Sequence, residues 1–294
     1  MPEGDSIFRA ARALHRALAG KVVTSFETTL APLERVNDDT PIRGRTVERV
    51  EARGKWCLIF FSGDLILLTH MRMSGSWHIY KTGERWQAPR AAMRVVITCG
   101  DVQAVAFHVP VAEFHTSRSL ERSENVPKLG IDVLGTSFSI DAATRALREH
   151  RQSHPDAEIA NVLLNQRVLA GIGNVYKSEI AFAAGVNPFR KIQTISDREL
   201  ERIAEIAERY MRANVAEDTG EGIVTYTGPR RTTHAMNQGA RLWVYRRQGQ
   251  ECRRCGTIIE MRRQGTGARS TYWCPSCQPW MDANERSGRP SSER

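Results

Sequence analysis

The sequence predicts an α+β protein of several domains, in which an N-terminal helix and an antiparallel β-sandwich precede a helical domain with a cysteine-bearing hairpin. Three observations predict this class. Short strand-like runs separated by turn signals fill residues 22–107. A helical period takes over from about residue 141. Two C-x-x-C pairs follow near the end of the chain.

The first half begins with a helix, which is predicted over Asp5–Leu18 and ends before Gly20. Its apolar residues share one face: Ile7, Phe8, Ala11, Leu14 and Leu18. Strands are predicted at residues 22–28, 46–52, 56–61, 65–69, 75–80, 93–99 and 102–107. Turn signals such as Ser62-Gly63-Asp64 separate them, as in an antiparallel sandwich or barrel.

The second half is predicted to be helical at residues 141–150, 156–169, 174–184 and 196–213. The Gly-rich run Leu169–Asn174 separates two of these patterns and predicts a helix–two-turn–helix element. Its glycines let the backbone approach a ligand closely, and the free N–H groups of the next helix suit phosphate. The alternative is a turn that merely joins two helices.

The boundaries of the expected domains follow from these patterns. We expect a β-sandwich domain at residues 1–135, a helix–two-turn–helix domain at 136–240, a cysteine hairpin at 241–280 and a disordered tail at 281–294. The glycine-rich stretch 219–240 is long and polar and holds Arg230, Arg231 and His234. Loops of this length often act as functional lids, and flexible filler is the alternative.

The composition favours a polyanionic partner. The 294 residues include 42 Lys and Arg against 33 Asp and Glu, which gives a net charge of +9 and a sequence pI near 9.6. This charge suits nucleic acid first and an anionic membrane second. No apolar run reaches the roughly 18 residues of a membrane span, and the N-terminus lacks the pattern of a signal peptide. We therefore expect a cytosolic protein that is not inserted in a membrane.

The six cysteines fall into two groups. Cys57 and Cys99 stand alone in apolar runs and are predicted to be small buried hydrophobes. The other four form two C-x-x-C pairs: Cys252, Cys255, Cys274 and Cys277. This spacing is typical of one structural Zn²⁺, because two tight turns present four thiolates to a tetrahedral ion and leave no open position. Disulfides are the alternative, which a cytosolic location disfavours.

The start of the chain, Met1-Pro2-Glu3-Gly4-Asp5, has the residues for covalent chemistry. Removal of Met1 is expected before a small second residue, and it leaves Pro2 as a secondary amine beside the Glu3 carboxylate. An α-amino group has a reference pKa of about 8, so part of it is neutral and nucleophilic at pH 7. Its attack on an aldehyde carbon gives an iminium ion, the electron sink of Schiff-base catalysis. An ordinary solvated N-terminus is the alternative.

Four separated places in the chain together resemble the formamidopyrimidine-DNA glycosylase and endonuclease VIII family of base-excision repair enzymes. Pro2-Glu3-Gly4 resembles that family's catalytic terminus, and Arg53-Gly54-Lys55 resembles the hairpin that carries its catalytic lysine. Leu169–Glu179 resembles its helix–two-turn–helix element. Cys252–Gln278 resembles its zinc finger, in which the arginine at the position of Arg269 grips phosphates.

The resemblance implies a bifunctional DNA glycosylase and abasic-site lyase. It would act as a monomer, in the bacterial cytosol with the nucleoid, on double-stranded DNA containing damaged bases or abasic sites. The damaged nucleotide would leave the stack, Pro2 would attack C1′ and displace the base, and Glu3 would act as acid and base. Lys55 would hold a phosphate or move protons, and β,δ-elimination would cleave the strand. Asn174 and Arg269 would clamp the flanking phosphates.

The segment His70–Gly75 supplies a candidate wedge for the gap that a flipped nucleotide leaves. An unbranched Met suits that task, so Met73 is the predicted filling residue, with Arg72 beside it. The alternative is that Met73 is a core methionine at a strand end.

A departure from the family pattern predicts the lesion. The oxidised-purine branch carries an Asp-Pro-Arg-Arg-Phe-Gly-like motif, whereas Phe107–Phe114 has no arginine pair. The resemblance is therefore nearer the endonuclease VIII branch, with oxidised pyrimidines as substrates. Oxidised purines stay the alternative, because Met73 looks more like the purine branch. Asp5 also replaces a proline common after Pro-Glu-Gly, although an acid suits the first turn of a helix.

Two other classes of protein stay open. A damaged-DNA-binding module without catalysis would not depend on Pro2. A zinc-ribbon protein that binds RNA or the ribosome would need an aromatic-rich recognition segment, which we do not find. The sequence does not predict the opposite base, the preference for duplex or single strands, or the order of residues 219–240. Nor does it assign roles to Lys177 and Glu179, which equally suit a helix surface.

Overall fold

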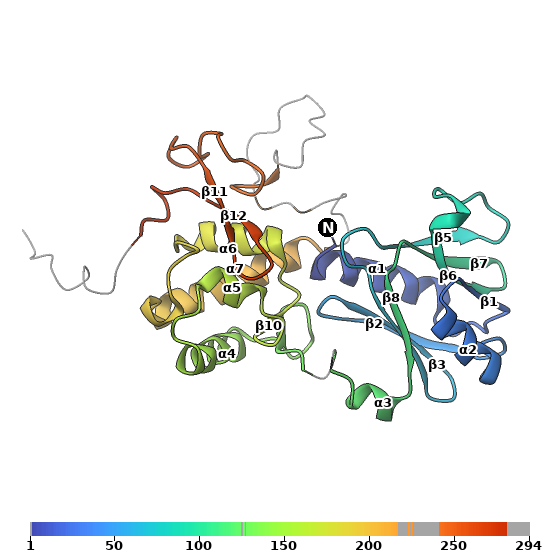
Figure 1. Ribbon diagram of the computed structural model, residues 1–294. Helices are drawn as coiled ribbons and strands as arrows, with labels where there is room; N and C mark the ends of the chain where they lie inside the picture. Colours follow the sequence, from blue (N-terminus) through green and yellow to red (C-terminus); the bar gives the residue numbers. More distant parts are fainter. Residues whose placement is uncertain are drawn as a thin grey trace, which may run out of the picture. The chain divides into compact units, whose positions relative to one another are not determined.

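The computed structural model describes residues 2–124, 126, 128–216, 223, 225 and 241–280. The chain divides into two compact units, residues 1–135 and 136–294 (Figure 1). The predicted tail at 281–294 and nearly all of the stretch 219–240, with Arg230, Arg231 and His234, lie outside the described residues.

The first unit consists of helix α1 (Gly4–Leu18) and two four-stranded antiparallel sheets (Figure 1). One sheet has the order β1-β6-β7-β5, with bounds Ser25–Thr28, Met93–Cys99, Val102–Phe107 and Ser76–Lys81. The other has the order β2-β3-β4-β8, with bounds Val47–Arg53, Trp56–Phe61, Leu65–His70 and Val111–His115. The unit also contains α2 (Ala31–Asp39), η1 (Arg90–Ala92), α3 (Ser117–Glu121) and β9 (Ile131–Asp132). The predicted antiparallel sandwich with its leading helix is confirmed.

The main core of this unit lies between α1 and the two sheets. Leu14 of α1, Ile59 of β3 and Ile97 of β6 belong to one buried cluster. The alternate residues of β3, such as Phe60, pack in a second cluster with Leu120 of α3. Strand β3 is therefore buried on both faces, which explains its uninterrupted apolar sequence.

Helix α1 runs antiparallel to β2, and this direction places the N-terminus. The Gly20 N–H donates to the Val47 carbonyl at 2.8 Å, and the Val50 N–H donates to His15 Nδ1 at 3.1 Å. From His15 back to Glu3 the helix spans about 18 Å at 1.5 Å per residue. From Val50 the strand runs about 10 Å to its end at Arg53, at about 3.3 Å per residue, and the β2–β3 turn continues it in the same direction. The start of α1 and the β2–β3 turn therefore lie at the same end of the sheet (Figure 1).

The second unit is mainly helical and ends in a short hairpin. Its helices are α4 (Ile140–Ser153), α5 (Ile159–Leu164), α6 (Asn174–Ala184), η2 (Ile192–Thr194) and α7 (Asp197–Ala213). Its strands are β10 (Leu169–Ala170), β11 (Glu260–Gln264) and β12 (Arg269–Trp273). The predicted helix over residues 156–169 is wrong in extent. Helix α5 stops at Leu164 because the Asn165 side chain accepts a hydrogen bond from the Arg167 N–H at 3.0 Å and stabilises a turn.

Candidate functional site

The N-terminal residues lie at the start of α1, partly inside the protein. Glu3 is the extended N-cap residue of α1, and its carbonyl accepts a hydrogen bond from the Ile7 N–H at 3.1 Å. The Glu3 side chain is fully buried, and Pro2 before it is half-buried. The residue that follows Pro2 in the chain therefore carries a carboxyl group in a low-dielectric environment.

Asp5 is also buried, which the sequence did not predict. Its Oδ2 lies 3.3 Å from an Arg9 nitrogen and accepts no hydrogen bond from any residue that the structure describes. Burial raises the pKa of Asp5, and the charge of Arg9 opposes this only in part. A second carboxyl group therefore lies three residues from Pro2, in surroundings that disfavour its charged form.

Lys55 occupies a two-residue hairpin turn between β2 and β3. Arg53 pairs with Trp56, so the turn consists of Gly54 and Lys55. Gly54 has a φ of +57°, as at the first position of a type II′ turn, where Gly is favoured. The buried Gly54 N–H donates to Asp132 Oδ2 at 2.7 Å, and the Leu134 N–H donates to Oδ1 at 3.1 Å. Asp132 thus holds the turn that presents Lys55.

His70 lies next to this turn, because Trp56 pairs with His70 across β3 and β4. The two rings meet edge to face with centroids 4.7 Å apart. Burial, with the charges of Arg72 and Lys55, lowers the pKa of His70 to about 4. The imidazole is therefore neutral at pH 7, and its Nδ1 accepts a hydrogen bond from the Arg72 N–H at 3.0 Å.

The wedge segment forms a tight turn after β4. Arg72 has a φ of +49°, and the Gly75 N–H donates to the Met71 carbonyl at 2.8 Å. Met73, at the tip of this turn, is 69% exposed, whereas Met71 is 3% exposed and belongs to the core. The alternative that Met73 is a core residue is therefore wrong.

The segment without the arginine pair lies at the same end of the sheet. Strand β7 ends at Phe107 and β8 begins at Val111, which pairs with His70. Residues 108–110 therefore connect the two sheets next to the wedge turn. The N-terminus, the Lys55 turn, the wedge turn and this connection, although far apart in the sequence, converge at one end of the sheet β2-β3-β4-β8.

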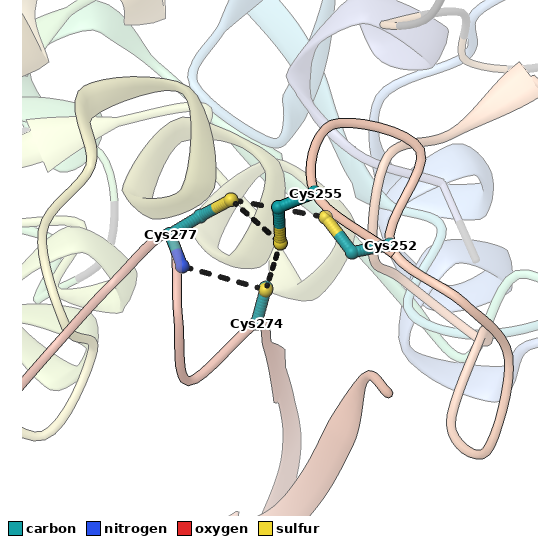
Figure 2. A group of neighbouring side chains, drawn as sticks. All are labelled: Cys252, Cys255, Cys274 and Cys277. Atoms are coloured by element: carbon teal, nitrogen blue, oxygen red, sulfur yellow. Dashed lines mark hydrogen bonds between the residues drawn. The ribbon is translucent and has the colours of Figure 1, made fainter. Parts of the chain in front are cut away.

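The four cysteines of the C-x-x-C pairs form a cluster at the base of the β11–β12 hairpin (Figure 2). All four sulfurs lie within 4.8 Å of one another, and the separations of three pairs are 3.4, 3.5 and 3.8 Å. A tetrahedral ion with Zn–S bonds of about 2.3 Å requires sulfur separations of about 3.8 Å. The donor set and its spacing therefore fit one structural Zn²⁺, as predicted, and none of the six cysteines forms a disulfide. Cys57 and Cys99 are buried in the core, as predicted.

The two-turn and the hairpin meet inside the second unit. Asn174 begins α6, and its Nδ2 donates to the Ser270 carbonyl at 3.1 Å. Arg269, the preceding residue of β12, is exposed. Gln166 braces the two-turn, since its side chain accepts from the Gly171 N–H at 3.0 Å and donates to the Ile172 carbonyl at 2.9 Å. The two residues expected to bind phosphates thus belong to adjoining backbone segments.

Lys177 and Glu179 are both fully buried, so a surface position is wrong for either. The carboxylate of Glu179 accepts from the backbone N–H groups of Trp243, Val244 and Tyr245 at 2.8, 3.0 and 2.8 Å. It also accepts from the Thr225 hydroxyl. Glu179 therefore anchors the segment that leads into the cysteine hairpin.

The fold and these sites define a zinc-containing nucleic-acid-binding protein with a candidate catalytic N-terminus. Three family models match the chain. The formamidopyrimidine-DNA glycosylase N-terminal domain matches residues 1–110, the H2TH domain of that glycosylase matches residues 129–226, and the zinc finger found in FPG and IleRS matches residues 249–279. The chain therefore belongs to the formamidopyrimidine-DNA glycosylase and endonuclease VIII family of base-excision repair enzymes. This membership excludes a ribosome-associated zinc-ribbon protein.

Curated relatives match over nearly their whole length. A probable endonuclease 8 2 of Streptomyces coelicolor is 37% identical over 95% of this chain and 94% of its own. The DNA-(apurinic or apyrimidinic site) lyase Nei2 of Mycolicibacterium smegmatis is 34% identical over 95% and 99%. The endonuclease 8 of Escherichia coli is 30% identical over 95% and 100%.

The fold is also that of solved structures. The formamidopyrimidine-DNA glycosylase of Lactococcus lactis, bound to DNA that contains an abasic site, superposes with a TM-score of 0.75. The match has 19% identity and covers 95% of this chain and 100% of the other. A complex of the same enzyme with DNA containing an oxidised pyrimidine also gives a TM-score of 0.75, at 20% identity. Among the described residues, no helix combines the length and apolar character needed to cross a membrane.

Proposed function

We propose that the protein removes oxidised pyrimidines from double-stranded DNA with the Pro2 amine as nucleophile, and then cleaves the strand by β,δ-elimination. Pro2 attacks C1′ of the flipped nucleotide, the base leaves, and an iminium links Pro2 to the opened sugar. Glu3 transfers protons to and from the sugar. The protein acts as a monomer in the bacterial cytosol.

The convergence at one end of the sheet β2-β3-β4-β8 carries this proposal. A secondary amine, a buried carboxyl group and a lysine come from chain positions 2, 3 and 55, and the packing of α1 on β2 supports their meeting at the same end of the sheet. The exposed side chain of Met73 next to them suits the filling of the gap in the duplex. Lys55 holds a phosphate of the scissile nucleotide, with the neutral His70 beside it.

In the second unit, Asn174 and Arg269 bind phosphates on either side of the flipped nucleotide. The exposed guanidinium of Arg269 and the N-terminus of α6 supply positive charge and N–H donors. The zinc site is structural, because four thiolates fill the coordination sphere of the ion. When bound, Zn²⁺ stabilises the hairpin and takes no part in the chemistry.

The pyrimidine preference rests on Phe107–Phe114, which lacks an arginine pair and lies next to the wedge turn through the pairing of Val111 with His70. Relatives named endonuclease 8 support the same branch. Without two arginines beside Met73, fewer side chains fill the gap that a flipped nucleotide leaves in the duplex. The alternative substrate is an oxidised purine, and the trapping experiment below distinguishes the two substrates.

Borohydride trapping on three labelled duplexes tests the proposal. The duplexes carry an oxidised pyrimidine, 8-oxoguanine or a bare abasic site, and reduction of the iminium gives a covalent band. The control is a variant with one Gly inserted before Pro2, which turns the proline nitrogen into a peptide nitrogen. We expect a band on the pyrimidine and abasic duplexes that disappears in the insertion variant.

Each other result has a definite meaning. Stronger trapping on 8-oxoguanine would move the protein to the purine branch. A band on the abasic duplex alone would leave a lyase without base removal. If no duplex is trapped although all are bound, the protein is a DNA-binding module and the covalent mechanism fails.

A further inference from the structure

Strand β12 lies against the first turns of α6 through a buried polar contact. The Ser270 carbonyl accepts hydrogen bonds from Asn174 Nδ2 at 3.1 Å and from Lys177 Nζ at 3.4 Å. Arg269 immediately precedes Ser270, so the contact restrains β12 one residue away from Arg269. One peptide group thus joins the two-turn, the hairpin and the Lys177 side chain.

The contact continues into the protein from Lys177. Its Nζ donates to the Thr271 hydroxyl at 2.7 Å, and that hydroxyl donates to Gln264 Oε1 at 2.8 Å. Gln264 Nε2 donates to Glu158 Oε2 at 2.7 Å and to the Pro188 carbonyl at 3.1 Å. Both strands of the hairpin are therefore hydrogen-bonded to the helical part of the unit.

Lys177 and Thr271 are fully buried, and Gln264 is 5% exposed. Burying an ammonium group is expensive, and an apolar side chain of similar length often stabilises a protein as well or better. Hydrogen bonds have strict directions, whereas apolar packing tolerates small displacements. A buried lysine in this place therefore fixes the position of the hairpin more than it raises the free energy of unfolding.

We propose that Lys177 is a positioning residue of the phosphate-binding surface, which holds Ser270 so that Arg269 and Asn174 engage neighbouring phosphates at the same time. This inference rests on the proposed function, in which those two residues contact phosphates. Lys177 itself acts through Ser270 and Thr271, because its ammonium group is buried beneath the strand.

The test is the salt dependence of DNA binding by Lys177→Met, which keeps the length of the side chain and removes its donors. Affinity for a duplex with a reduced abasic site is measured from low to moderate salt, on zinc-loaded full-length protein. Each phosphate contact contributes about 0.9 to the slope of log K against log salt. We expect severalfold weaker binding and a slope lower by about that amount, as in Arg269→Ala.

Two matched variants complete the design. Lys191→Met removes the same charge from an exposed lysine that pairs with Asp156, and it should leave affinity and slope unchanged. Thr271→Val keeps the ammonium group but breaks its link to Gln264, and it should behave as a milder Lys177→Met. If Lys177→Met fails to fold or to hold zinc, Thr271→Val decides the question alone.

The double variant with Arg269→Ala separates the possible roles. If Lys177 acts by positioning Arg269 and Asn174, the loss of affinity in the double variant is smaller than the sum of the two single losses. Additive losses would show an independent charge effect and overturn the proposal. So would a lower free energy of unfolding in Lys177→Met with wild-type affinity and slope. If Arg269→Ala alone changes nothing, the phosphate role of Arg269 and this inference both fail, whereas borohydride trapping still tests Pro2.

Discussion

Asp132 accepts a hydrogen bond at 2.7 Å from the backbone N–H of Gly54, the residue before Lys55. The buried Gly54 N–H takes no part in the β2–β3 ladder, because the strand pairing ends at Arg53 and Trp56. A buried N–H without a partner is unfavourable, so a carboxylate 78 residues further along the chain completes the turn. The position of the candidate catalytic lysine therefore depends on a residue remote in sequence.

Asp132→Ala is expected to lower both stability and activity. It leaves the Gly54 N–H buried without an acceptor, which costs about 1–3 kcal/mol in the free energy of unfolding. The rate of borohydride trapping should fall in the wild-type background and stay unchanged in a Lys55→Met background. Asp64→Ala is the matched control, because Asp64 holds the Ser117 N–H at the opposite end of β3 but is exposed. Equal rate losses in both backgrounds would contradict the link to Lys55.

Glu179→Gln is expected to loosen the segment that leads into the cysteine hairpin. An amide offers one oxygen instead of two, so its NH₂ group would face backbone N–H donors. We expect a loss of about 2–4 kcal/mol in a urea titration, because hydrogen bonds to a buried charge are among the stronger ones. Glu208→Gln, which loses a partly exposed contact with Arg212, should lose far less. Similar losses in both variants would contradict the anchoring role.

Helices and strands were predictable from the sequence where their apolar residues repeat on a face that packs in the core. The apolar face from Ile7 to Leu18 predicted α1 to within a residue, and the predicted bounds of β3, β6 and β7 agree with the structure. Helix α2 and strand β8 were missed. Helix α2 buries only Leu33, so it has no apolar stripe to detect.

The site residues that escaped prediction have partners far away in the chain. All of α6 except Val175 is buried, so no periodicity distinguishes the inward side of this helix from a surface. The partners of Lys177 and Glu179 lie between 46 and 94 residues further on. Asp132 and His70 were likewise unassigned, because strand pairing and a single hydrogen bond bring them to Lys55. By contrast, the cysteine spacing alone predicted the zinc site, because its ligands come in two local pairs.

Removal of zinc is expected to weaken DNA binding through loss of the hairpin. Cys252 and Cys274 belong to an apolar cluster with Phe182 of α6, so metal binding and local folding are coupled. Cys274→Ser should lose its zinc and the salt-dependent part of its DNA affinity. Metal analysis, gel-shift titration and hydrogen exchange of β12 would measure this. Retained protection of β12 without zinc would contradict the coupling.

Asp5→Asn is expected to stabilise the protein at neutral pH. Burial raises the pKa of Asp5 above its unfolded value, so its favourable contribution exists below the unfolded pKa and is lost as pH rises through the folded pKa. The variant should therefore unfold at higher urea than the wild type at pH 7, and the difference should narrow towards pH 4. Asp141→Asn, at an exposed first-turn position of α4, should instead be slightly destabilising. A pH-independent difference would show that the charge of Asp5 is not responsible.

His70 should make the wedge turn sensitive to acid. Burial and the charges of Arg72 and Lys55 lower its pKa from 6.5 to about 4, so the neutral ring contributes stability above pH 6.5. That contribution is lost as pH falls from about 6.5 to about 4, where protonation of Nδ1 removes the acceptor of the Arg72 N–H. His70→Asn, which keeps a hydrogen-bond acceptor but does not titrate, should flatten the stability profile between these pH values. His108→Asn, at an exposed imidazole with a φ of +51°, should leave the slope of the profile unchanged. An unaltered slope in His70→Asn would show that other groups produce the loss of stability in acid.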